Sequence, residues 1–199
     1  MKEDYNIRPA TMIDSKEIAK LIAISSDGVA VIEWQEQAQQ QGCEPLEIGE
    51  SIYKKDKGDY SYKNAIIVER DNKIAGMLLS FAMPGATTRD ETNRPKADDS
   101  NIFAPYIYLE EPNSWYVCGI AFYPQHRGQG LGTTLMQLSE QQARDNEFKK
   151  LSLVAFEENH GSVRLYERLG YQAVDWAPIV PHPLIHYTGK ALLMTKDVE

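Results

Sequence analysis

Three glycines at alternate positions constrain the fold of this chain more than any other feature of its sequence. They are Gly128, Gly130 and Gly132. An apolar run at Trp115–Phe122 precedes them and predicts a buried strand, and residues 130–148 after it show helical spacing. Without a Cβ atom the backbone bends sharply and can come close to a ligand. The first amides of a helix lack partners within it and favour an anion, so the pattern indicates a phosphate site.

The spacing of the glycines excludes two common phosphate loops. A Walker loop needs a lysine directly after its last glycine, whereas Thr133 follows Gly132. A dinucleotide fingerprint that starts at Gly128 would need a third glycine where Thr133 stands. It would also follow the first strand of its unit, and this loop comes late in the chain. Arg127 adds a fixed positive charge beside the glycines, and a plain turn with a helix cap is the alternative to a ligand site.

The rest of the chain alternates between strand and helix patterns. After a short strand at residues 6–10, Asp14 suits a helix N-cap, and Glu17 completes a capping-box pattern. The further helices are expected at residues 31–40, from Pro45 to before Lys57, at 130–148 and at 162–169, and the further strands at 64–70, 73–82, 115–122, 151–156, 171–176 and 191–196. This pattern predicts an α/β fold with a mixed sheet, in a single domain over residues 1–199.

One long stretch, residues 84–113, has no regular pattern and several acidic residues. It is expected to be an irregular insertion between two strands, with a short apolar patch at residues 102–109. Insertions of this length are more often functional or mobile than plain connectors.

Charge and cysteine content narrow the classes of function. The formal net charge of −8 argues against nucleic-acid or anionic-membrane binding, which needs a basic face, and is compatible with a cationic substrate such as an amine. No apolar run reaches the roughly 20 residues of a membrane span. Cys43 and Cys118 make no disulfide framework, so we expect a cytoplasmic protein.

Together, these motifs resemble the GNAT superfamily of N-acetyltransferases, whose signature is [Q/R]-x-x-G-x-[G/A] after a strand. The resemblance covers nearly the whole chain outside residues 84–113. The segments that carry it are Ile7-Arg8-Pro9-Ala10 with Asp14, the run from Gly119 to Gly132, and Asn159-x-x-Ser162-x-x-Leu165-Tyr166-x-x-x-Gly170-Tyr171.

The resemblance implies a GNAT-like acyl-CoA N-acyltransferase fold, a splayed central sheet flanked by helices, with acetyl-CoA as the cofactor. It implies that backbone groups of Ile120, Ala121 and Phe122 bind the pantetheine arm. Asn159 would contact the pantetheine or acyl region, and Ser162 stands where many members have alanine. The residues implied to hold the pyrophosphate are Arg127, Gly128, Gln129, Gly130, Leu131, Gly132 and Thr133.

The resemblance also implies that Tyr166 is the general acid that protonates the leaving thiolate; the alternative is a half-buried core aromatic. The general base stays open. Ser114 stands where some members have a glutamate, so Glu111 or a water chain lined by Tyr116 and Cys118 could accept the proton.

Two further groups of residues have only weak patterns. His182 and His186 have a spacing that could suit a metal, but no Cys or His cluster joins them, so no metal is implied. By analogy with the fold, these histidines or Glu33 and Trp34 border the acceptor pocket.

The sequence therefore predicts direct transfer of an acetyl group from acetyl-CoA to a primary amine of a small molecule, amino acid or peptide, through a ternary complex. The alternative is a catalytically weak GNAT-fold module that senses acyl-CoA or binds a protein. Neither nucleic acid nor a membrane is an expected partner, and a homodimer is common in folds of this type.

Overall fold

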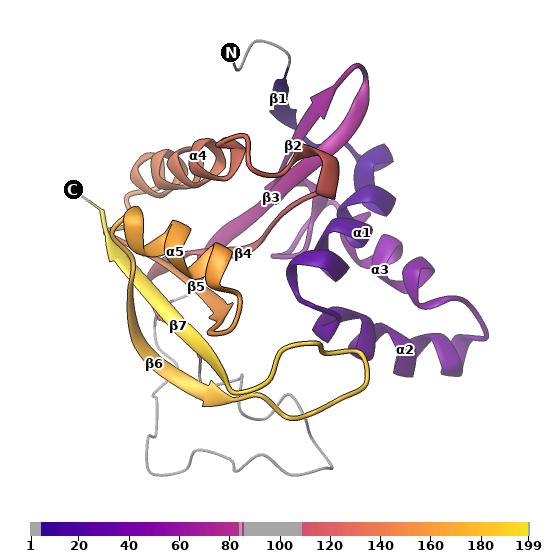
Figure 1. Cartoon of the computed structure of the whole chain (residues 1–199). Coiled ribbons are helices and arrows are strands. Elements are labelled where there is room, and N and C mark those ends of the chain that lie inside the picture. The colour runs from indigo at the N-terminus through magenta and orange to yellow at the C-terminus, as the bar shows by residue number, and fades with distance from the viewer. Residues whose placement is uncertain (1–4, 84, 86–108, 199) are drawn as a thin grey trace. The chain divides into compact units, whose positions relative to one another are not determined.

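The computed structural model describes residues 5–83, 85 and 109–198. The interior of the expected insertion, including most of the apolar patch at 102–109, lies outside these residues, and the two strands that flank it end at Met83 and begin at Ser114. The helices are α1 (Ser15–Ser25), α2 (Val29–Gln41), α3 (Pro45–Tyr53), α4 (Leu131–Asp145) and α5 (His160–Arg168). The strands are β1 (Asn6–Pro9), β2 (Ala65–Arg70), β3 (Lys73–Met83), β4 (Ser114–Phe122), β5 (Lys150–Phe156), β6 (Gln172–Pro178) and β7 (Lys190–Asp197) (Figure 1).

The strands form a mixed sheet. Within the described part of the chain, hydrogen-bonded neighbours follow the order β1-β2-β3-β4-β5-β7-β6. Strands β4 and β5 pair in parallel, whereas β2 pairs antiparallel with both β1 and β3, and β7 with both β5 and β6. The predicted α/β fold with a mixed sheet is therefore confirmed, and most element bounds agree with the expected ones to within two residues.

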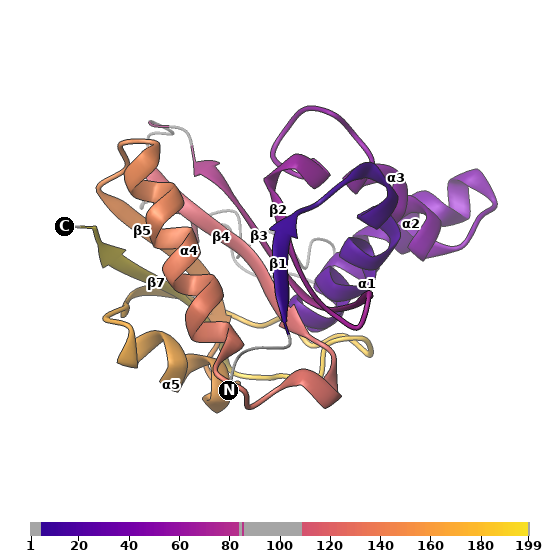
Figure 2. The same cartoon turned by 90° about the horizontal axis from the view of Figure 1, so that it is seen from above.

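The chain divides into two compact units, which are described separately. The first comprises Met1–Phe81 and Cys118–Leu135, and the second Ala82–Val117 and Met136–Glu199. In the first unit, α1, α2 and α3 gather on one side of strands β1 to β3 (Figures 1 and 2). Its core is made of fully buried aliphatic side chains that include Ile18, Leu21, Ile67 and Met77. Burial of each such side chain contributes about 1.5–3 kcal/mol to folding.

Glycine and proline set the limits of the helices in the first unit. Gly28 and Gly42 flank α2 with φ angles of 88° and 68°, a left-handed conformation that ends a helix at little cost for glycine. Pro45 is the first residue of α3, where its missing N–H costs no hydrogen bond. The β2–β3 hairpin turns at Asp71 and Asn72, which also have positive φ angles.

The second unit is built on β5, β6 and β7. Helix α5 packs against β5, and Lys196 of β7 forms an ion pair with Glu140 of α4 at 2.6 Å. The start of β4 joins β5 through parallel pairs from Trp115 to Val117. Gly170, with a φ of 91°, follows the end of α5 as the sequence predicts.

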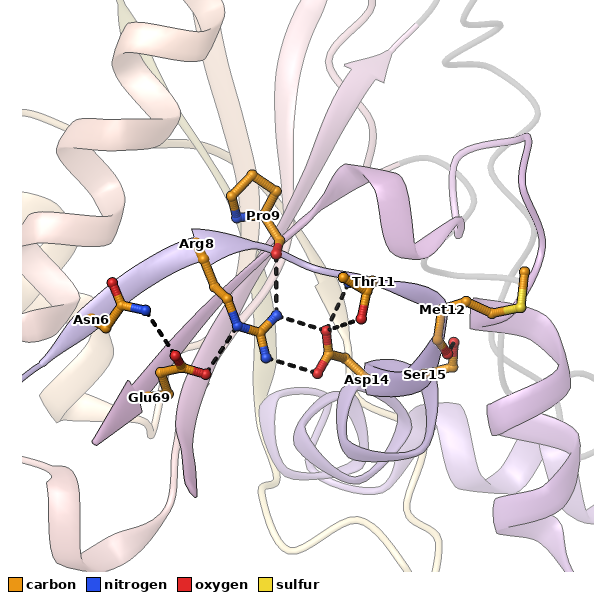
Figure 3. A network of polar contacts seen from close by, with 8 residues as sticks. All are labelled: Asn6, Arg8, Pro9, Thr11, Met12, Asp14, Ser15 and Glu69. Atoms are coloured by element: carbon orange, nitrogen blue, oxygen red, sulfur yellow. Dashed lines mark hydrogen bonds and ion pairs between the residues drawn. The ribbon is translucent and has the colours of Figure 1, made fainter. Parts of the chain in front are cut away.

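A network of polar side chains fastens β1 to β2 and to the start of α1 in the first unit (Figure 3). The guanidinium of Arg8 donates to both carboxylate oxygens of Asp14, at 2.8 and 3.0 Å, and its Nε donates to Glu69 at 2.9 Å. Thr11 donates to Asp14 from its backbone and its hydroxyl, at 2.7 and 2.9 Å. Burial tends to raise the pKa of Asp14, but the bonds from Arg8 and Thr11 outweigh it and hold that pKa below its ordinary value.

This network corrects the expected capping box. Asp14 stands at the N-cap of α1, but its side chain makes no cap bond because Arg8 and Thr11 take its oxygens. The carboxylate of Glu17 instead binds Lys20 and Tyr123. The sequence pattern was right for the helix start and wrong for the partners, because Arg8 and the sequence-distant Tyr123 bind these carboxylates in place of the backbone amides.

Replacing Asp14 tests the network. We expect Asp14→Asn to lower the free energy of unfolding by about 1–3 kcal/mol at pH 7, because Arg8 loses a charged partner. The pKa of Asp14 in the folded state lies below its unfolded value of about 3.9. The stability that Asp14 contributes is therefore present above pH 4 and is lost as pH falls through the folded-state pKa. Urea unfolding of both proteins between pH 3 and pH 7 measures the difference.

The matched control is Asp56→Asn, which removes an exposed ion pair with Lys63. Exposed pairs contribute about 0–1 kcal/mol, so this variant should unfold almost like the wild type. Equal losses in both variants, or a loss at Asp14 that grows on acidification, would contradict the role assigned to the network.

Candidate active site

The glycine-rich loop lies in the first unit, between β4 and α4 (Figure 2). A short 3-10 helix at Pro124–His126 turns the chain after β4, and Gly128 and Gly130 then take φ angles of 73° and 76°. The first hydrogen bond of α4 runs from the amide of Thr134 to the carbonyl of Gly130, at 3.3 Å. Within the described residues, the amides from Gly128 to Thr133 have no acceptor. The loop therefore presents consecutive unsatisfied donors at the positive end of a helix.

The side chains of the loop add charge and leave space. Arg127 is exposed, and its Nε donates to the carbonyl of Phe122 at 2.9 Å. Its terminal nitrogens have no partner among the residues that the structure describes. A Cβ atom added to Gly128 would meet nothing within 4 Å. These features fit a pyrophosphate group, which needs converging N–H donors, positive charge and room.

Arg127 and Leu131, two of the residues predicted to hold the pyrophosphate, each leave only one group available to a ligand. The amide of Arg127 already donates to Pro124 at 3.2 Å, so only its guanidinium is available to a ligand. The side chain of Leu131 is 4% exposed and belongs to the core, which anchors the first turn of α4 and leaves its amide at the loop.

Close packing positions the end of β4 under the loop. A Cβ atom on Gly76 of β3 would lie 2.5 Å from the carbonyl oxygen of Ala121 and would also clash with the Phe122 ring. A Cβ atom on Gly119 would lie 2.7 Å from Ile22 and 2.8 Å from Ser25 of α1. The two glycines thus let β3 and α1 approach β4 closely. The sequence signal for Gly76, a lone glycine inside a strand pattern, was available but was missed.

Helix α1 also holds the first residue of the loop. Tyr123 donates from its hydroxyl to Glu17 at 2.6 Å, and from its amide to the carbonyl of Ala75 at 2.9 Å. Burial, and then the bond to Glu17, raise the pKa of Tyr123 well above its ordinary value, so its hydroxyl remains a donor at any physiological pH. Burial tends to raise the pKa of Glu17, but bonds from Lys20 and Tyr123 outweigh it and keep Glu17 ionised.

The three predicted pantetheine-binding residues lie at the end of β4. Ala121 and Phe122 are buried, and Ile120 is half-buried. The parallel register of β4 with β5 ends at Val117, so all three residues come after the last paired position.

The second unit brings Asn159, Ser162 and Tyr166 together on α5. The side-chain oxygen of Asn159 accepts the amide of Ser162 at 3.3 Å and so caps the helix. Tyr166 is 7% exposed and lies beside the ring of Tyr171. Burial raises the pKa of Tyr166 to about 12, and the Ser162 side chain partly offsets that rise. Tyr166 is therefore a protonated donor at neutral pH.

The candidates for the general base lie near the start of β4, in the same unit as Tyr166. Lys150 forms an ion pair with the carboxylate of Glu111 at 2.6 Å. Ser114 is fully buried and its hydroxyl bonds both the carbonyl of Glu111 and the hydroxyl of Ser152, each at 2.6 Å. Tyr116 is half-buried and lies opposite Ser152 in the register. Ser114 thus has a structural role at the position where some GNAT members have a glutamate.

Trp34 is buried and Cys118 is half-buried in the first unit. Trp34 is 2% exposed and packs against Gly49 of α3 and against the ring of Tyr53, so it is a core residue and no wall of an acceptor pocket. Burial, and then the charge of Asp59, raise the pKa of Cys118 to about 12. A thiol of that pKa is no nucleophile at neutral pH.

Two features are absent from the part of the chain that the structure describes. There, no group of three or more His, Cys, Asp or Glu side chains could hold a metal ion. His182 instead accepts the amide of Leu184 at 3.2 Å. None of the described helices is long and apolar enough to cross a membrane.

The geometry of the loop agrees with a match to a known family. The model of the Acetyltransferase (GNAT) family matches residues 29–171, which is well over half of the chain and includes the loop and Tyr166. This chain belongs to the GNAT acetyltransferase family. Membership confirms both the recognised superfamily and the predicted enzyme class, an acyl-CoA-dependent N-acetyltransferase. No curated protein matches the sequence at a significant level.

Solved structures of the same fold act on different acceptors. An agmatine N-acetyltransferase is 14% identical, with a TM-score of 0.67, and the match covers 98% of this chain and 100% of the other. The ribosomal-protein-S18-alanine N-acetyltransferase of Escherichia coli is 13% identical, with a TM-score of 0.59 and coverage of 98% and 94%. A putative acetyltransferase of Salmonella typhimurium, solved with its cofactor acetyl-CoA, is 15% identical, with a TM-score of 0.56 and coverage of 99% and 95%. Identities this low establish the fold alone.

A substitution in the loop tests whether it binds the donor. We expect Gly130→Asp to abolish acetyl-CoA binding in calorimetry, because it places a Cβ atom and a negative charge where the pyrophosphate oxygens would lie. Aspartate tolerates a positive φ better than most residues, so the variant should still fold.

Gly42→Asp is the matched control. Gly42 has a similar φ of 68°, a Cβ atom there meets nothing within 4 Å, and the residue lies at the end of α2. This variant should bind acetyl-CoA like the wild type. Unchanged affinity in a folded Gly130→Asp variant would mean that the loop is only a turn.

Proposed function

We propose that this protein transfers an acetyl group from acetyl-CoA to a primary amine by direct attack in a ternary complex. The observation that carries the proposal is the run of unsatisfied amides from Gly128 to Thr133, beside the guanidinium of Arg127. The family match and the similar protein solved with acetyl-CoA support acetyl-CoA as the donor. Because the family match draws on both units, we treat residues 1–199 as one acetyltransferase domain.

The chemistry divides into binding and proton transfer. Acetyl-CoA supplies a thioester whose acyl carbon accepts the amine nitrogen while the carbon–sulfur bond breaks. The loop amides and Arg127 hold the pyrophosphate, and the end of β4 from Ile120 to Phe122 binds the pantetheine arm through its backbone. Positioning of donor and amine on one protein supplies much of the rate enhancement.

Tyr166 gives its phenolic proton to the departing thiolate. Its pKa of about 12 keeps Tyr166 protonated at neutral pH, so its hydroxyl can donate to the sulfur as the carbon–sulfur bond breaks. The amine loses its own proton to solvent through Glu111 or through water beside Tyr116, the two routes open for the base. The hydroxyl of Ser162 orients Tyr166, and Asn159 caps the helix that carries both residues.

The acceptor is proposed as a class of compound. The net charge of −8 favours a cationic amine over an anionic one through long-range attraction. Two proteins of similar fold are named as N-acetyltransferases of agmatine and of an alanine of ribosomal protein S18, so both small amines and peptides belong in the test. We place the protein in the cytoplasm, where acetyl-CoA is available to it, and leave a homodimer as a prediction.

A thiol-release assay tests the enzyme against the alternative of a sensing module. Acetyl-CoA is offered with a panel of polyamines, amino acids and peptides with free N-termini. The proposal expects thiol release that depends on one class of amine, with a matching acetylated product by mass spectrometry. Tight binding of acetyl-CoA without turnover on any acceptor would instead establish the sensing module.

The role of Tyr166 has its own test. We expect Tyr166→Phe to lower kcat about 100-fold while the Kd of acetyl-CoA changes less than about twofold, because only proton transfer is lost. The acid acts in its protonated form, which persists below a pKa of about 12. Ionisation of Tyr166 should therefore cause no loss of wild-type kcat between pH 7 and pH 10.

Tyr171→Phe is the control within the same unit. The hydroxyl of Tyr171 is buried and has no hydrogen-bond partner among the described residues, so its removal should leave kcat within about twofold of the wild type. A Tyr166→Phe variant that loses kcat and donor affinity equally would have lost packing rather than an acid.

A further inference from the structure

The side chain of Tyr5, just before β1, reaches two residues of the glycine-rich loop. Its hydroxyl donates to the side-chain oxygen of Gln129 at 3.0 Å and lies 2.9 Å from Nδ1 of His126. The rings of Tyr5 and His126 meet edge to face, with centroids 5.7 Å apart. Arg70 of β2 lies 5.4 Å from the centre of the Tyr5 ring. Tyr5 is thus held by β2 and contacts the loop on both sides of Arg127.

The hydrogen-bond directions in this cluster are mutually consistent. A phenol has one proton, and Tyr5 gives it to Gln129, so Tyr5 accepts a hydrogen from Nδ1 of His126. The amide nitrogen of Gln129 reaches back to the carbonyl of Gln125 at 3.5 Å, which orients its oxygen toward Tyr5. The side chain of Gln129 is therefore tied at both ends.

The position of Gln129 makes these two side-chain hydrogen bonds important for the conformation of the loop. Gln129 stands between Gly128 and Gly130, whose φ angles are 73° and 76°. Glycine can adopt these angles, but it adopts other angles as readily. Glycine loses more backbone freedom on ordering than any other residue, so a loop with this pattern does not hold one conformation by local sterics. The side chain of Gln129 is the element between the two glycines that can fix the direction of the adjacent amides.

We propose that Tyr5 and Gln129 are positioning residues that hold the phosphate loop in its ligand-binding conformation before the donor arrives. The inference rests on the proposed function, because it assumes that the loop binds the pyrophosphate of the donor. Neither side chain takes part in acetyl transfer. A loop ordered in advance loses less of its binding free energy to ordering, so the pair acts on the affinity for the donor.

The test compares CoA with a ligand that lacks the pyrophosphate and nucleotide of CoA. Calorimetry with CoA and with S-acetylpantetheine, which lacks the pyrophosphate and nucleotide, is run on the full chain carrying Tyr5→Phe or Gln129→Met. We expect each variant to raise the Kd of CoA about three- to tenfold, the range for one lost hydrogen bond. The affinity for S-acetylpantetheine should stay at its wild-type value in both variants, and the kcat at saturating acetyl-CoA should stay at its wild-type value in Tyr5→Phe.

A double variant shows whether the two residues act through one bond. If they do, Tyr5→Phe combined with Gln129→Met should cost no more affinity for CoA than the stronger single variant. Tyr62→Phe is the control, since its hydroxyl bonds an exposed side chain, Asp56, in the same unit. It should bind CoA with wild-type affinity.

Three outcomes would overturn the inference. The first is wild-type affinity for CoA in both single variants. The second is a loss of CoA affinity in the double variant that equals the sum of the two single losses. The third is an equal loss of affinity for S-acetylpantetheine, which would reveal a general structural role. A wild-type protein that binds no CoA would instead overturn the proposed function, so the two failures are distinguishable.

Discussion

An array of backbone amides can bind a phosphate only if the protein leaves those amides unsatisfied, and a folded chain ordinarily satisfies them. Positive φ angles at Gly128 and Gly130, followed by the start of α4, create such an array here. The helix makes its first hydrogen bond from Thr134, so the donors before it have no acceptor among the described residues. Every functional proposal for the first unit depends on this arrangement, because it is the proposed donor site.

Unsatisfied amides make a loop less stable, and contacts from the N-terminal part of the chain offset that cost. Glu17 of α1 holds Tyr123 at the start of the loop, and Tyr5 contacts Gln129 at its centre. The network around Arg8 and Asp14 in turn fastens β1 to α1, which carries Glu17. The segment before residue 29 therefore supports the proposed donor site, although it lies outside the stretch that matches the family model.

The sequence predicted features that depend on neighbours in the chain. The glycine-rich turn before α4 and the end of α5 before Gly170 depend on residues a few positions apart, and the structure agrees with both. Asp14 and Glu17 show where such reasoning fails. Their spacing matches a capping box, but Arg8 and Tyr123 bind their carboxylates more strongly than the helix amides do, and a local pattern contains no information about Tyr123. The prediction that Trp34 borders the acceptor pocket has the same weakness, because helix α3 covers this side chain in the folded protein.

By itself, then, the sequence determined the fold class, the family and the place of the phosphate loop, because each is encoded by residue types at short, regular spacings. The tertiary structure alone decided which side chains support that loop, since Tyr5 and Gln129 meet across more than a hundred residues of chain. It also decided the environment of Tyr166, whose pKa rises to about 12 because the folded second unit removes it from water. Burial of this kind is a property of packing between distant segments, which no local pattern specifies.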